Sequence, residues 1–122
     1  MRRLLIALAV CLSAPLAYAD GAHADDFAVV KDEDQFVKLI AGKALTRLGI
    51  RLNVDPQGRI TGNAFGRPIT GQWDWNAGYF CRDLNYGEDP LEFNCQMVKV
   101  RGNTLRFISD RGEGIYADLR LR

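Results

Sequence analysis

The chain has 122 residues, of which 48% are hydrophobic and 25% charged, and its formal net charge is +1 at pH 7. A chain of this length supports one domain with one modest core. The near balance of 16 basic and 15 acidic residues argues against a protein that binds polyanions through its overall charge.

The N-terminus has the pattern of a secretory signal peptide. Arg2 and Arg3 form a positively charged start, an apolar run extends from Leu4 to Leu12, and Ala17-Tyr18-Ala19 matches a cleavage site. The apolar run is shorter than the roughly 18 residues that a membrane-spanning helix needs, so we expect no transmembrane segment. We expect cleavage near Ala19 and a periplasmic or secreted protein.

This pattern divides the chain into three segments. Residues 1–19 are the signal peptide, residues 20–31 a flexible acidic leader, and residues 32–122 a single β-rich domain. The leader holds His23, the single histidine of the chain, with two aspartates nearby. Because a flexible tail holds three ligands poorly, we expect no metal site there.

The domain is predicted to begin with a helix of about two to three turns. Asp32 can accept a hydrogen bond from the backbone N–H of Gln35, and the Gln35 side chain can reciprocate, as in the capping box of helix starts. Gly42 is a natural C-terminal stop. The apolar face between these ends consists of Phe36, Val37, Leu39, Ile40 and Ala41.

From Leu48 onward, apolar residues alternate with polar ones, which predicts strands with one buried face. The connections are too short for the crossovers that parallel strands require. We therefore predict an α+β fold that is mainly β: one N-terminal helix, then an antiparallel meander of about seven strands, strongly curved or closed into a small barrel, with one disulfide. The expected strands cover residues 48–54, 59–65, 69–75, 79–86, 93–100, 104–109 and 115–121.

Cys81 and Cys95 are predicted to form a cross-strand disulfide. If they lie opposite each other on antiparallel strands, the chain must reverse near Glu88, and the surrounding Gly87-Glu88-Asp89-Pro90 consists of turn formers. Closing a loop of about 15 residues is worth roughly 3 kcal/mol in the chain-entropy account. A reactive or metal-binding pair is the alternative, but it lacks C-x-x-C spacing and a nearby histidine.

Most familiar catalytic arrangements do not fit this sequence. Ser109 has no histidine within the domain to activate it, which argues against Ser-His and Cys-His catalysis. The glycines within residues 58–71 form neither G-x-G-x-x-G nor a phosphate-binding loop, so we expect no cofactor. One enzymatic alternative stays open, in which Asp83 and Glu92 act as acid and base in a small enzyme of the cell envelope.

The region rich in Trp and Tyr instead favours a non-catalytic binding or inhibitor-like module. Trp73, Trp75 and Tyr79 would supply contact area, while Arg82 and Asp83 would orient a polar group of the ligand. Packing of these aromatic rings in the core is the alternative. The expected partner is an envelope protein, a glycan or a small apolar ligand.

Basic residues gather in the C-terminal part of the chain. In an exported protein we expect no nucleic acid as ligand, and we interpret this basic, aromatic surface as a solvated outer face. Its residues are Arg101, Arg106, Arg111, Tyr116, Arg120 and Arg122.

Short motifs support a family resemblance over most of the domain. They are Gly42-Lys43-Ala44-Leu45-Thr46-Arg47, Gly71-Gln72-Trp73-Asp74-Trp75, Gly78-Tyr79-Phe80-Cys81-Arg82-Asp83-Leu84, Asn94-Cys95-Gln96 and Asp110-Arg111-Gly112. With these motifs the chain resembles a family of small exported bacterial proteins of unknown function, some members of which carry the label dihydrodipicolinate reductase. That enzyme resembles a Rossmann dehydrogenase with a glycine-rich nucleotide loop, and no motif of this sequence supports such an activity.

Overall fold

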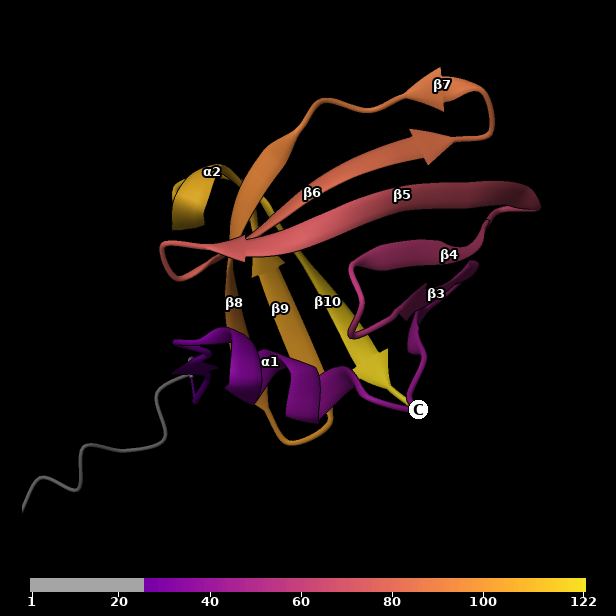
Figure 1. Cartoon of the computed structure of the whole chain (residues 1–122). Coiled ribbons are helices and arrows are strands. Elements are labelled where there is room, and N and C mark those ends of the chain that lie inside the picture. The colour runs from indigo at the N-terminus through magenta and orange to yellow at the C-terminus, as the bar shows by residue number, and fades with distance from the viewer. Residues whose placement is uncertain (1–25) are drawn as a thin grey trace, which may run out of the picture.

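The computed structural model describes residues 26–122, which form a β-barrel with a helix packed against it (Figure 1). The expected signal peptide and most of the acidic leader lie outside these residues. The elements in chain order are β1 (Ala28–Val29), α1 (Glu33–Ile40), β2 (Leu45–Arg47), β3 (Ile50–Val54), β4 (Arg59–Ala64), β5 (Arg67–Asn76), β6 (Tyr79–Tyr86), β7 (Asp89–Pro90), β8 (Asn94–Arg101), β9 (Thr104–Ile108), α2 (Ser109–Gly112) and β10 (Tyr116–Leu121).

Eight antiparallel strands form the closed barrel, namely β2 to β6 and β8 to β10. Consecutive strands pair with each other, β6 pairs with β8, and β10 pairs back with β2. The two-residue strands β1 and β7 extend the sheet beside β8 and β6. The predicted antiparallel meander with an N-terminal helix is therefore confirmed, and of the two expected forms the chain adopts the closed one.

Helix α1 begins and ends where its sequence predicts. Asp32 is the N-cap, and its carboxylate accepts a hydrogen bond of 2.8 Å from the backbone N–H of Gln35. The Gln35 side chain accepts a hydrogen bond from the backbone N–H of Lys31 rather than from that of Asp32. The expected reciprocal hydrogen bond is therefore made to the residue before the N-cap. After the C-cap, Gly42 adopts a positive φ of 70°, a conformation that glycine adopts without strain.

The expected strand from Leu48 to Val54 is wrong at its first residues. Leu48 and Gly49 form the turn between β2 and β3, and the Leu48 side chain is 93% exposed instead of buried. Leu48 is in phase with Ile50, Leu52 and Val54, so the period-two alternation continued by coincidence into the turn, which Arg47 and Ile50 flank as a register pair. The predicted strand is therefore β3 alone, and the preceding strand β2 was not predicted.

The hairpin that carries the disulfide has the predicted register. Cys81 lies directly opposite Cys95 on β6 and β8, and the two sulfur atoms are bonded. The reversal is tighter than expected, because only Gly87 and Glu88 form the turn and Asp89-Pro90 already pairs with β6 as β7. Pro90 is tolerated there because an edge strand can leave one side of its backbone without ladder hydrogen bonds.

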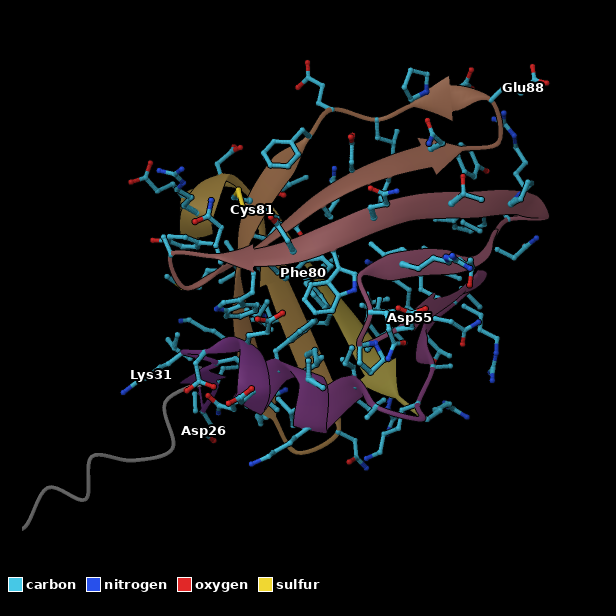
Figure 2. All side chains as sticks on the ribbon, viewed as in Figure 1. Asp26, Lys31, Asp55, Phe80, Cys81 and Glu88 are labelled. Atoms are coloured by element: carbon cyan, nitrogen blue, oxygen red, sulfur yellow. A yellow bond between two sulfur atoms is a disulfide. The ribbon has the colours of Figure 1, made fainter. Side chains whose placement is uncertain are left out.

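Aromatic side chains fill the barrel interior beneath α1. Phe36 of α1 is completely buried, and its ring centroid lies 5.2 Å from those of both Trp73 and Phe80. Phe80 packs in turn on Phe107, with ring centroids 5.3 Å apart. In Figure 2, Phe80 points into the barrel, whereas the next residue, Cys81, lies toward α2. Helix α1 thus covers the interior of the barrel.

Two glycines allow neighbouring strands to approach closely on the interior side. A Cβ atom at Gly62 would lie 2.2 Å from the carbonyl oxygen of Arg51, and one at Gly71 would lie 2.1 Å from that of Asp83. Neither position has room for a side chain, so both are required for the tight coiling of a barrel this small.

The connection between β9 and β10 contains the short helical turn α2, where the sequence predicts only a turn between the strands at 104–109 and 115–121. Within it, Asp110 and Arg111 both have a φ of 55°. The Asn94 side chain holds this conformation, because it accepts from the backbone N–H of Asp110 and donates to its carboxylate. Ile115, the expected first inward residue of the last strand, lies before β10 and is 84% exposed.

Candidate functional site

The structure does not bring the five predicted binding residues to one surface. Trp73 and Trp75 on β5 and Arg82 on β6 belong to the inward-facing set, because Trp73 is opposite Arg82 and Trp75 is opposite the buried Phe80. Tyr79 and Asp83 belong to the outward-facing set. Their shared role in binding therefore stays a prediction.

Trp73 is a core residue. Its side chain is only 6% exposed, and its indole Nε1 donates a 2.9 Å hydrogen bond to the backbone carbonyl of Asp55. Trp75 is half-buried and stacks on Phe36 with ring centroids 5.3 Å apart. Among the described residues the buried Nε1 of Trp75 finds no hydrogen-bond partner. Both rings thus take the core-packing alternative that the sequence left open.

Arg82 supports the loop between β7 and β8. Its guanidinium donates to the backbone carbonyl of Glu92, which lies in that loop. Burial lowers the pKa of Arg82, and the neighbouring carboxylate of Asp83 opposes this shift. Arg106 forms its ion pair with Asp118 rather than with Asp83.

The outer face of β4, β5 and β6 carries a polar depression that we call the Asp83 groove. Two cross-strand rows of exposed side chains form it, because Arg59, Gln72 and Asp83 are register neighbours, as are Thr61, Thr70 and Asn85. Its volume is about 640 Å³. The residues that define the groove are Arg59, Thr61, Thr70, Gln72, Asp83, Asn85 and Pro90.

A second, smaller depression of about 240 Å³ continues from the groove along β5 and β6. Asp83 and Gln72 line both depressions, and the smaller one is also lined by Trp73, Asp74, Cys81 and Phe93. The Phe93 side chain is 61% exposed, so an aromatic ring stands in water beside polar groups. The loop that positions this ring is the one that Arg82 supports.

The carboxylates near the groove are open to water. Asp74 and Asp83 share the smaller depression, and both are exposed. Glu92, the proposed partner of Asp83 in the enzymatic alternative, is also exposed. Within residues 26–122 no three His, Cys, Asp or Glu side chains gather closely enough to hold a metal ion.

Sequence reasoning found Asp83 but missed its neighbours. Thr70 and Gln72 alternate with the inward-facing residues of β5, so the period-two pattern already placed them on the outer face. Phe93 was assigned to a strand, whereas it lies in the loop before β8. The period-two pattern could not predict the strand registers that place Gln72 of β5 between Arg59 of β4 and Asp83 of β6.

Comparisons with known proteins identify no relative of this chain. No family model, no curated protein and no solved structure matches the chain. Across residues 26–122, the helices are too short and too polar to cross a membrane. The disulfide between Cys81 and Cys95 is compatible with an exported protein, because such bonds persist in oxidising compartments.

Proposed function

We propose that this protein is a non-catalytic binding module of the cell envelope that binds a glycan along the Asp83 groove. The observation that carries the proposal is the pair of cross-strand rows in the groove, where exposed hydroxyl, amide and charged groups stand side by side over three strands. A location in the cell envelope is consistent with the resemblance of the sequence to a family of small exported bacterial proteins.

The groups in the groove suit a ligand rich in hydroxyls. Each sugar hydroxyl is both a donor and an acceptor, and the groove offers both kinds of partner through Thr70, Gln72 and Asn85. Arg59 supplies donors at one side and Asp83 supplies acceptors at the other. The exposed ring of Phe93 can cover the apolar face of a sugar ring.

The exposure of the carboxylates supports binding rather than catalysis. Hydrolysis of a glycosidic bond needs one carboxylic acid that stays protonated, and enzymes achieve this by sheltering it from water. Asp74, Asp83 and Glu92 are all exposed. The small envelope enzyme with Asp83 and Glu92 as a carboxylate pair remains the alternative that the test must exclude.

Titration of the processed, isotope-labelled protein with soluble peptidoglycan fragments tests the proposal. We expect backbone amide shifts along β4, β5 and β6. Gln72→Ala should weaken binding about two- to tenfold, as for the loss of a neutral hydrogen bond, and Asp83→Asn about tenfold or more. The matched controls are Asn103→Ala and Asp34→Asn, which change exposed side chains outside the groove and should leave affinity unchanged.

Two results would overturn the proposal. One is the absence of amide shifts with every glycan fragment at millimolar concentration. The other is release of cleaved product by the wild-type protein, together with its loss in a folded Asp83→Asn variant, which would establish the enzymatic alternative.

A further inference from the structure

A second surface of the barrel, spread over β8 to β10, β2 and β3 and sharing no lining residue with the Asp83 groove, is strongly basic. Arg101, Arg120 and Arg51 occupy one cross-strand row on the outer face, separated by Thr104 and Thr46. Because neighbouring strands lie about 4.8 Å apart, the three arginines recur about every 10 Å around the barrel. We call this surface the basic wall, and its residues are Arg47, Arg51, Arg101, Arg106, Arg120 and Arg122.

Asp118 of β10 neutralises part of the basic wall. Asp118 forms a bidentate pair with Arg106, at 2.8 and 3.0 Å. In the part of the chain that the structure describes, no carboxylate forms an ion pair with Arg51, Arg120 or Arg122. These three guanidinium groups, with Arg47, surround an open depression of about 520 Å³.

Two apolar side chains stand at the edge of this depression. Leu48, at the tip of the β2–β3 turn, is 93% exposed, and Phe65, at the tip of the β4–β5 turn, is 70% exposed. The backbone N–H of Phe65 donates a 2.8 Å hydrogen bond to the carbonyl of Gly49, and the Phe65 ring occupies the space where a Cβ at Gly49 would lie. The two tips are therefore held together.

We propose that the basic wall and these two tips dock the protein on a membrane surface that contains anionic lipids. The arginines would bind phosphate groups of the lipid headgroups, to which the guanidinium fork is well matched. Leu48 and Phe65 would enter the boundary between headgroups and acyl chains, as apolar side chains of peripheral proteins do. The site is separate from the glycan site proposed above, because no residue lines both depressions, although the β4–β5 hairpin carries Phe65 at its tip and groove residues along its strands.

The combination of features selects a lipid surface over other anionic partners. A single exposed leucine is ordinary in a soluble protein and needs no explanation. Two apolar tips locked side by side, next to arginines without ion-pair partners, match a partner that is anionic at its surface and apolar just beneath it. A soluble polyanion offers no such apolar layer, and the Asp74 and Asp83 side of a second copy offers a single exposed ring, that of Phe93.

Vesicle co-sedimentation tests this proposal with the processed protein, because the apolar run from Leu4 to Leu12 would itself bind lipid. Phosphatidylcholine vesicles are compared with vesicles that also contain phosphatidylglycerol. We expect binding to the anionic vesicles only, and its strong reduction in about 1 M salt, where the Debye length falls to about 3 Å. The variant Arg51→Gln/Arg120→Gln should bind about 25-fold more weakly, at about fivefold for each charge.

The apolar tips have a separate test. Leu48→Ser should weaken binding about tenfold, and Leu48→Ser/Phe65→Ser by more. The controls are Ile115→Ser, which removes an equally exposed apolar side chain elsewhere, and Lys38→Gln, which removes an exposed charge on α1. Tryptophan emission and circular dichroism verify that each variant is folded, and Leu48→Ser keeps the test valid if the double variant unfolds.

Several outcomes would overturn the proposal. Equal binding to both kinds of vesicle, or to neither, contradicts a role for the arginines at a membrane. Loss of vesicle binding in the arginine variant with unchanged binding in Leu48→Ser and in Leu48→Ser/Phe65→Ser would mean that the wall is attracted by charge alone and that the apolar tips do not enter the membrane, which contradicts the proposed docking. A dimer in solution that dissociates in salt and in the arginine variant, without vesicle binding, would mean that a second copy covers the wall.

Discussion

Replacing Phe36 by alanine tests whether helix α1 is an integral part of the barrel. Phe36 is completely buried and is the residue through which α1 contacts four aromatic rings. Its ring centroid lies between 5.2 and 6.4 Å from each of them. The contacted residues are Trp73, Trp75, Phe80 and Phe107.

The expected loss of stability is large for a domain of this size. Truncation of a buried phenylalanine to alanine costs about 3–5 kcal/mol, because the transfer free energy of the ring is lost and a cavity remains. The net stability of such a domain is about 5–15 kcal/mol. A loss at the lower end would reduce the melting temperature by about 12 °C or more.

Urea unfolding followed by tryptophan fluorescence measures this loss directly, because Trp73 and Trp75 both lie against Phe36. Phe93→Ala is the matched control, since it removes the same ring from a position that is 61% exposed. We expect the control to lose less than about 1 kcal/mol. If Phe36→Ala were no less stable than Phe93→Ala, the helix would not be part of the cooperative core.

Two further predictions concern the covalent link and an ion pair. Cys81→Ala/Cys95→Ala should lower the free energy of unfolding by roughly 3 kcal/mol, measured by urea unfolding, and a reducing agent should destabilise the wild type but not this variant. The hydrogen bonds from Arg106 lower the pKa of Asp118 below its ordinary value of 3.8. The stability that this pair contributes is therefore fully present above pH 3.8 and is lost as the pH falls through the lower pKa of the folded state. Because water screens this partly exposed pair, the loss of stability should be at most about 1 kcal/mol. Asp118→Asn should remove this pH-dependent loss from acid unfolding curves. An unchanged pH dependence in that variant would contradict the role of the Arg106–Asp118 pair.

Local chemistry made some elements predictable from the sequence. Asp32 caps α1 because its side chain reaches a backbone N–H only three residues away, and no distant part of the chain is needed for that bond. The pairing of Cys81 with Cys95 was predictable for a similar reason, since the turn between them sets the register of the hairpin. Leu48 shows the limit of this reasoning, because alternation alone cannot distinguish a strand from a hairpin tip.

The candidate sites depended on pairings between distant strands. Asp83 was singled out early, but the groove exists only because Arg59 and Gln72 are placed beside it by the β4–β5 and β5–β6 registers. The basic wall likewise requires that Arg120 of β10 meet Thr46 of β2, at the pairing that closes the barrel. The arginines were visible in the sequence, yet their gathering around Leu48 was not.

The sequence by itself determined the helix, the alternation of the strands and the disulfide, because capping, side-chain period and turn length act over a few residues. Only the tertiary structure decided that the sheet closes between β10 and β2, that Trp73 lies in the core with Trp75 packed against it, and that two chemically different surfaces with separate lining residues lie on the barrel wall. Closure is a long-range choice, because it depends on the accumulated twist and close approach of eight strands rather than on any one of them.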